Sequence, residues 1–158
     1  SLILVENIWY LFTTSKKGLE IFWSEDMLKS DFTPHPMNPI TTNLKYSRSA
    51  GALINISGSF YRISQDSSGV YGKNINISII KKLSKEIFIE DIFIKDYFNN
   101  KISKWNLSGG HHLSIAEFKE KFVVATDILT NDYLINKYIS PLIRKKSFSE
   151  ILKFKIND

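Results

Sequence analysis

The sequence predicts a mainly β domain built from consecutive antiparallel hairpins. Short runs rich in aromatic and β-branched residues recur along the chain, turns that contain Gly separate them, and apolar and polar side chains alternate within several of them. The 158 residues, 43% of them hydrophobic, are enough for a domain with its own core. A meander of about seven or eight strands suits a sandwich, a barrel or several propeller blades, and periodicity does not choose among these.

The first predicted hairpin joins strands at 7–14 and 19–24 through a turn in which Gly18 supplies a positive φ. Residues 31–39 hold three of the four prolines, which predicts an ordered loop because proline removes a donor and fixes φ. A second hairpin is predicted from strands at 50–57 and 60–65, which turn at Gly58.

Two further strands are predicted at 74–83 and 86–94, although a short helix also fits the second of these ranges. Strands at 113–116 and 122–126 form the last predicted hairpin, with a polar turn at 117–121. The character then changes, because residues 133–154 place apolar side chains at helical spacing around Pro141. We therefore divide the chain into a β body at 1–130 and a C-terminal helical segment, of one or two helices, at 131–158.

Charge and cysteine content exclude several classes of protein. The net charge is +5, but only three of the 21 basic residues are Arg and the Lys residues are scattered, which favours a solvated surface over a nucleic-acid interface. The absence of cysteine excludes disulfides, thiolate metal sites and a Cys nucleophile, and it fits a reducing, cytoplasmic location. No stretch approaches the roughly eighteen apolar residues of a membrane span.

Several unusual motifs follow one another between Trp9 and Asp127. The most specific stretch runs from His35 to Asp66, and a Gly-Gly-His-His-Leu motif at 109–113 follows it. The matching segments, in chain order, are Trp9-Tyr10-Leu11-Phe12-Thr13-Thr14, 19–26, His35-Pro36-Met37-Asn38-Pro39, Arg48-Ser49-Ala50-Gly51, Tyr61-Arg62-Ile63-Ser64-Gln65-Asp66, Tyr71-Gly72 and 109–113.

Together these motifs resemble the propeller domain at the N-terminus of glucosamine inositolphosphorylceramide transferases, which in bacteria occurs beside formyltransferase-like domains. That domain is related to the five-bladed propellers of the arabinanase, levansucrase and invertase class, which includes family 43 glycosidases. The resemblance implies antiparallel blades of a five-bladed type of propeller. The chain departs from the family in lacking the blades that precede the Trp9 strand, with their His-Leu-Ser-Tyr-Pro-like and Pro-Glu motifs, so we expect a partial propeller.

A partial propeller exposes blade edges, which invites association. The expected partners are therefore a missing propeller half, a fused transferase domain or a second copy of the chain, besides a sugar or glycoconjugate ligand. No nucleic acid, membrane span or cofactor is expected, and no Gly-rich phosphate loop is present.

Glycoside hydrolysis needs two carboxylates that flank the scissile bond. Asp66 is the preferred catalytic candidate because it ends a strand and begins a loop of small residues, and Asp127 and Glu90 are alternatives. Against this, an Asp before Ser-Ser-Gly commonly caps a turn. The resemblance also places Arg48 and its neighbours where glycosidases carry their general acid, which counts against hydrolysis.

A polar pocket is the second kind of site that the motifs suggest. Arg pairs carboxylates, phosphates or sugar hydroxyls through a planar fork, and Tyr stacks on sugar rings. The alternatives are an Arg62–Asp66 salt bridge and ordinary strand packing of the tyrosines. The candidate substrate-binding residues are Arg48, Tyr61, Arg62, Gln65, Asp66, Tyr71 and His111.

Histidine is the remaining metal ligand to consider, and the chain has three. His35 beside proline is interpreted as a loop-shaping residue. His111 and His112 would face opposite ways as neighbours on one strand, so no metal site is expected. The resemblance implies that one of these two histidines faces the propeller axis.

Three functions remain open on the sequence alone. The first is a carbohydrate-binding or glycoconjugate-binding propeller module that serves a neighbouring transferase. The second is part of a glycosidase-like or transferase-like enzyme whose other catalytic residues lie outside this chain. The third is a scaffold for protein interaction.

Overall fold

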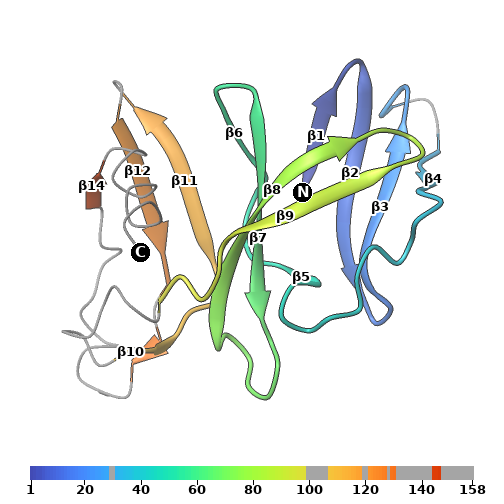
Figure 1. Cartoon of the computed structure of the whole chain (residues 1–158). Coiled ribbons are helices and arrows are strands. Elements are labelled where there is room, and N and C mark those ends of the chain that lie inside the picture. Colours follow the sequence, from blue (N-terminus) through green and yellow to red (C-terminus); the bar gives the residue numbers. More distant parts are fainter. Residues whose placement is uncertain (29–30, 99–106, 119–120, 128, 131–143, 147–158) are drawn as a thin grey trace.

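The computed structural model describes residues 1–28, 31–98, 107–118, 121–127, 129–130 and 144–146. Within these ranges the chain consists of strands and loops, without an α-helix. Three antiparallel sheets of three or more strands follow one another along the chain and lie side by side, and a fourth sheet has only two strands (Figure 1). The predicted mainly β, antiparallel class is therefore confirmed.

Sheet A is the N-terminal sheet, sheet B the central one and sheet C the C-terminal one. Sheet A has the order β1 (Leu2–Val5), β2 (Ile8–Ser15), β3 (Gly18–Ser24) and β4 (Thr33–Pro34). In sheet B, β5 (Arg48–Ser49) and β6 (Ile54–Ile56) both pair with β7 (Ser59–Asp66), and β8 (Asn74–Leu83) and β9 (Phe88–Ile94) follow outward. Sheet C has β11 (Leu113–Phe118), β12 (Lys121–Thr126) and β14 (Arg144–Lys146), and β10 (Leu107–Gly109) pairs separately with β13 (Leu129–Thr130).

Two of the hairpins turn through two residues with positive φ. Glu6 and Asn7 have φ of 49° and 63° between β1 and β2, and Ser57 and Gly58 have φ of 49° and 81° between β6 and β7. Such turns match the right-handed twist of the strands that they join. The positive φ predicted for Gly18 is also present, at 120°.

The predicted strands are present, with two differences of substance. The sequence did not predict five strands of two to four residues, namely β1, β4, β5, β10 and β13. Of the strand predicted at 50–57 only β6 (Ile54–Ile56) is present, because the chain leaves β7 after β5 (Arg48–Ser49) and rejoins it at Ile54. Between them, the Ala50 carbonyl accepts a hydrogen bond from the amide of Leu113 (N–O 2.8 Å), so this segment links sheet B to sheet C.

The predicted C-terminal helical segment lies outside the described residues, apart from β14. For residues 144–146 the helix prediction is wrong, since Val123 of β12 pairs with Lys145 in an antiparallel ladder. Pairing with the open edge of β12 outweighs the local helical spacing there.

Sheet B lies between the other two sheets and is packed on both sides. Between sheets A and B the buried apolar residues are Tyr10, Phe12, Leu19, Ile21 and Phe88. On the other side of sheet B they are Ala50, Ile54, Tyr61, Ile63, Ile75, Ile77, Phe98, Leu113 and Val124. The two clusters make sheet B the centre of the fold.

The outer face of sheet A is also apolar. Cross-strand neighbours Leu2 and Leu11, and Leu4 and Trp9, share this face with Phe22. None of these five residues belongs to either core cluster, and Leu2 and Leu4 are 41% and 48% exposed. Sheet A therefore has one face packed on sheet B and one apolar face without a partner sheet in the part of the chain that the structure describes.

Gly51 lies close to the backbone of β11 in sheet C. A Cβ atom at this position would be 2.2 Å from the carbonyl oxygen of Leu113. This oxygen belongs to the backbone, so it cannot move aside without a cost in free energy. We expect Gly51→Ala to lower the free energy of unfolding by about 1–3 kcal/mol, as overpacking does, in a urea denaturation experiment. Gly58→Asn is the control, because its site is open and Asn tolerates a positive φ. Equal stability of the two variants would contradict this contact.

Candidate functional site

Arg62 is buried in β7 and forms a structural ion pair. Its Nε donates to Glu90 Oε2 (2.7 Å), its Nη2 contacts Glu90 Oε1, and its Nη1 donates to the Tyr46 carbonyl (2.9 Å). The Arg62 side chain is 2% exposed and that of Glu90 13%. The alternative of a salt bridge was right in kind, but its partner is Glu90 of β9 and not Asp66. Neither residue is exposed enough to line an open pocket.

Asp66 and Gln65 are buried at the end of β7, with 2% and 1% exposure. Asp66 Oδ1 accepts hydrogen bonds from the backbone amide (2.7 Å) and the hydroxyl (2.6 Å) of Ser68. Gln65 Nε2 donates to Ser67 Oγ (3.1 Å). Both side chains thus hold the loop that leads to β8, and this geometry favours turn capping over catalysis for Asp66.

Tyr61 packs inside the core and not on the surface. It is 8% exposed, and its ring meets that of Phe93 edge to face, with centroids 5.3 Å apart. Burial raises the pKa of Tyr61 above its ordinary value. Its position agrees with strand packing, the alternative considered for it, and separates it from Tyr71.

Three of the predicted binding residues do come together at the surface. The guanidinium carbon of Arg48 lies 4.9 Å from the ring centroid of Tyr71, and the Tyr71 and His111 rings are 5.2 Å apart between centroids. Arg48 is exposed, Tyr71 is 56% exposed and the His111 side chain 38%. We refer to these residues as the Arg48–Tyr71–His111 cluster.

The cluster is assembled from three separate segments of the chain. Arg48 lies in β5, Tyr71 in the loop before β8, and His111 just before β11. The amide of Gly110 donates to the Gly72 carbonyl (2.8 Å), and a Cβ at Gly109 would be 2.1 Å from that same oxygen. Glycine at 109 therefore permits the close approach that places His111 beside Tyr71.

Asp127 completes the cluster and was considered from the sequence only as a hydrolytic acid. Its Oδ2 lies 2.8 Å from His111 Nδ1, and its Oδ1 accepts hydrogen bonds from the backbone amides of His112 (2.6 Å) and His111 (3.1 Å). Asp127 follows β12, whose last residue, Thr126, pairs with Leu113. This register brings the end of β12 to the start of β11. The contact between Asp127 and His111 could therefore be recognised only from the pairing of these two strands.

The other two histidines have separate partners. His35 is 2% exposed, its Nε2 lies 3.1 Å from the Ser84 carbonyl and its Nδ1 accepts from the Met37 amide, which agrees with a loop-shaping role. His112 Nε2 lies 2.9 Å from Ser114 Oγ. His111 precedes β11, so strand alternation does not apply to it. No group of three or more His, Asp or Glu in the described residues is placed to hold a metal ion.

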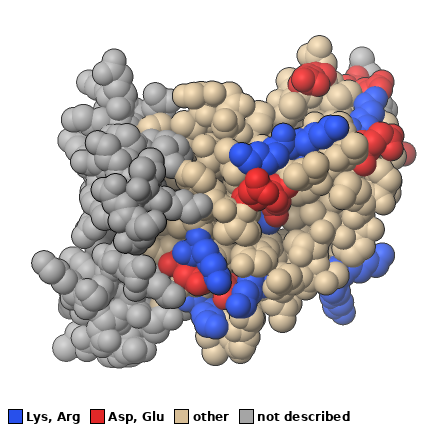
Figure 2. All heavy atoms as spheres, in the orientation of Figure 1, with Lys and Arg blue, Asp and Glu red and all other residues tan. Residues whose placement is uncertain are grey.

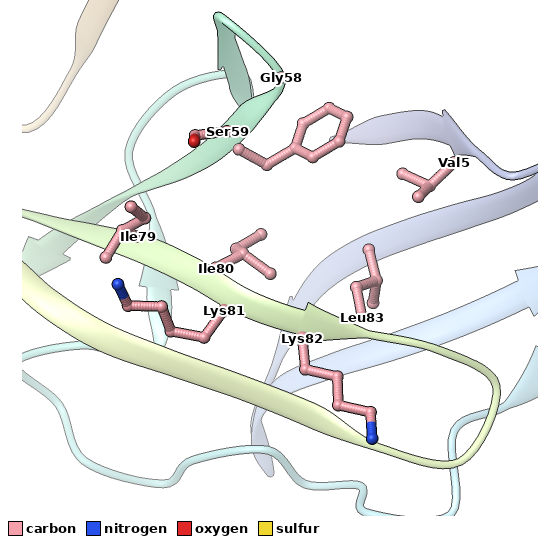
Figure 3. A pocket seen from close by; sticks show the side chains of 9 residues that line it. Val5, Gly58, Ser59, Ile79, Ile80, Lys81, Lys82 and Leu83 are labelled. Atoms are coloured by element: carbon pink, nitrogen blue, oxygen red, sulfur yellow. The ribbon is translucent and has the colours of Figure 1, made fainter.

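A crevice of about 420 Å³ opens elsewhere, between the β1–β2 end of sheet A and β8 (Figure 3). Val5, Ile80 and Leu83 point into it, whereas Lys81 and Lys82 lie on the other side of β8 (Figure 3). None of the predicted site residues lines it. The crevice lacks the converging polar groups of a specific ligand site.

Charged side chains form small groups of mixed sign on the face in Figure 2. Lys85 pairs with Glu25 (Nζ–Oε1 2.5 Å) and lies over the Trp23 ring. Such pairs are typical of a solvated surface. In the ranges that the structure covers, no helix is long and apolar enough to cross a bilayer.

Comparison with known proteins assigns the chain to a family. Residues 2–128 match the family described as "Glucosamine inositolphosphorylceramide transferase 1, N-terminal". The chain belongs to this family. Members of the glucosamine inositolphosphorylceramide transferase family that resemble it include proteins of that name from rice, Oryza sativa subsp. japonica, and from Arabidopsis thaliana.

The rice relative is 32% identical over an alignment of 126 residues that covers 72% of this chain and 17% of the relative. The Arabidopsis relative is 32% identical over an alignment of 136 residues that covers 81% of this chain and 18% of the relative. The chain therefore spans less than a fifth of the length of these transferases. No solved structure matches the chain.

Proposed function

We propose that this chain is a glycoconjugate-binding module of a glycosyltransferase and that the Arg48–Tyr71–His111 cluster is its binding surface. The association with a transferase is supported by the family, since the relatives are named glucosamine inositolphosphorylceramide transferase. One observation supports the choice of this surface: Arg48, Tyr71 and His111, from three segments of the chain, contact one another at the surface.

The chemistry of the cluster suits a sugar. Tyr71 is 56% exposed although Arg48 lies over its ring, so aromatic surface remains on which a pyranose ring can stack. Arg48 adds a planar fork of donors for hydroxyl, carboxylate or phosphate oxygens. Of the three acids considered, Asp127 contacts the cluster through His111, whereas Asp66 and Glu90 are buried or nearly buried and engaged in hydrogen bonds with Ser68 and Arg62. A module that binds without hydrolysing accounts for this better than a pair of catalytic carboxylates.

We further propose that the three sheets are consecutive blades of a propeller that other sheets complete. The first strands of the sheets approach one another: the Ser1 hydroxyl donates to the Gly51 carbonyl (3.1 Å), and the Leu113 amide donates to that of Ala50 (2.8 Å). Sheet B is covered on both faces, as an inner blade would be. The apolar outer face of sheet A is a suitable surface for the next blade.

The proposal is tested by titrating the protein with monosaccharides, uronic acids, inositol phosphates and nucleotide sugars, with calorimetry as the readout. We expect one sugar class to bind, and Tyr71→Ala or Arg48→Ala to raise its Kd by about tenfold or more through the loss of stacking or of charged hydrogen bonds. Lys73→Ala is the matched control, since Lys73 is exposed in the same loop as Tyr71. Absence of binding to every sugar would overturn the proposed function, and binding unaffected by both variants would overturn the site.

A further inference from the structure

We propose that Asp127 fixes the tautomer of His111, so that the cluster recognises a ligand hydroxyl that donates to His111 next to an acceptor group that binds Arg48. This inference rests on the proposed function and specifies what the ligand presents at that site. Asp127 acts here as a positioning residue, because its contacts are to His111 and its neighbour.

The Asp127 carboxylate is itself held firmly. Oδ1 accepts the amide hydrogens of His112 (2.6 Å) and His111 (3.1 Å), and Oδ2 lies 2.8 Å from His111 Nδ1. Two backbone donors therefore fix the carboxylate plane before a ligand arrives. The carboxylate in turn orients an imidazole that already packs against the Tyr71 ring, 5.2 Å away between centroids.

A carboxylate only accepts hydrogen bonds, and a neutral imidazole carries a single N–H. Beside Asp127 that hydrogen lies on Nδ1, which leaves Nε2 as an acceptor. Nε2 of His111 makes no hydrogen bond to any residue that the structure describes, and the side chain is 38% exposed. A ligand that lies on Tyr71 thus meets an acceptor at His111.

Arg48 presents the opposite chemistry on the same aromatic ring. Its guanidinium only donates, and it takes no carboxylate partner in the described part of the chain. The site therefore selects a ligand with a donor and an acceptor in defined positions. In a sugar these are a hydroxyl at His111 and an oxygen-bearing substituent at Arg48.

Asp127→Asn is the decisive variant. The Asn side-chain oxygen still accepts from the backbone amides, but its NH₂ group can only donate toward Nδ1. The His111 hydrogen then moves to Nε2 and the ligand meets a donor, the same reversal that disables an Asp–His pair in serine proteases. Nitrogen-15 NMR of the imidazole, recorded at a pH of about 8.5 where free histidine is neutral, reports which nitrogen is protonated.

We expect protonated Nδ1 in the wild type, protonated Nε2 in Asp127→Asn, and about tenfold weaker binding of the sugar found by calorimetry at an unchanged Tm. A deoxy analogue that lacks the hydroxyl should bind the two proteins equally. His111→Gln is a second variant that leaves Asp127 in place and restores an acceptor near Nε2, so it should bind more tightly than His111→Ala.

The outcomes separate the two proposals. If no sugar binds the wild type, the proposed function fails first. If the sugar binds but Asp127→Asn keeps the wild-type tautomer or the wild-type Kd, the function stands and the role of Asp127 is refuted.

Discussion

Arg62→Met is expected to lower the free energy of unfolding by about 3–5 kcal/mol, because it leaves the Glu90 carboxylate largely buried without its partner. Glu90 is 13% exposed, and the guanidinium that faces it also holds the Tyr46 carbonyl. Domains of this kind have a total stability of about 5–15 kcal/mol, so much of the variant should be unfolded at moderate urea concentrations. Urea denaturation followed by circular dichroism measures the loss.

Two controls make this result specific to the buried pair. Lys85→Met removes the cation of the exposed Lys85–Glu25 pair and should change stability little. The double variant Arg62→Met/Glu90→Met removes both charges and should recover much of the loss, since apolar residues can replace a buried pair. If Arg62→Met and Lys85→Met were equally stable, the buried pair would not have the role assigned to it.

Phe12→Ala is expected to cost about 3–5 kcal/mol, as truncation of a buried aromatic side chain does. Phe12 is 2% exposed, and its ring meets that of Phe88 edge to face with centroids 5.8 Å apart. The pair joins β2 of sheet A to β9 of sheet B, so the variant opens a cavity where the two sheets meet.

Leu11→Ala is the matched control for this variant, since Leu11 is the preceding residue of β2 and lies on its half-buried outer face. Its loss should be clearly smaller in the same denaturation experiment. Equal losses for Phe12→Ala and Leu11→Ala would mean that the outer face of sheet A is as well packed as its inner face.

The hairpins were predictable because their information is local. Gly18 and Gly58 mark turns, and the aromatic and β-branched residues of 7–14 mark a strand. Alternation separates Tyr10 and Phe12 from Trp9 and Leu11, but only the packing of sheet A on sheet B shows that Tyr10 and Phe12 are the buried pair. β14 could not be predicted, because its strand conformation depends on pairing with β12 and not on its own spacing.

The site was predictable only in part, for a reason that lies in β7. This strand is covered on both faces, so Arg62, Gln65 and Asp66 are all buried and no alternation separates pocket residues from core residues. The partner of Arg62, Glu90, lies 28 residues away across two ladders, and register shifts in the β8–β9 ladder conceal it from the sequence. Arg48, Tyr71 and His111 were each proposed from the motifs, but their proximity depends on the Gly72–Gly110 contact between loops.

The enclosed position of sheet B also has a kinetic consequence. The amide hydrogens of β7 and β8 are shielded by strands on either side and by a neighbouring sheet above and below, so they can exchange with solvent only when the whole domain opens. The amides of β1 and β4 lie at the margins of sheet A and can exchange through local fraying. We therefore expect the strands at the margins of the fold to unfold first and β7, which carries the buried Arg62, to unfold last.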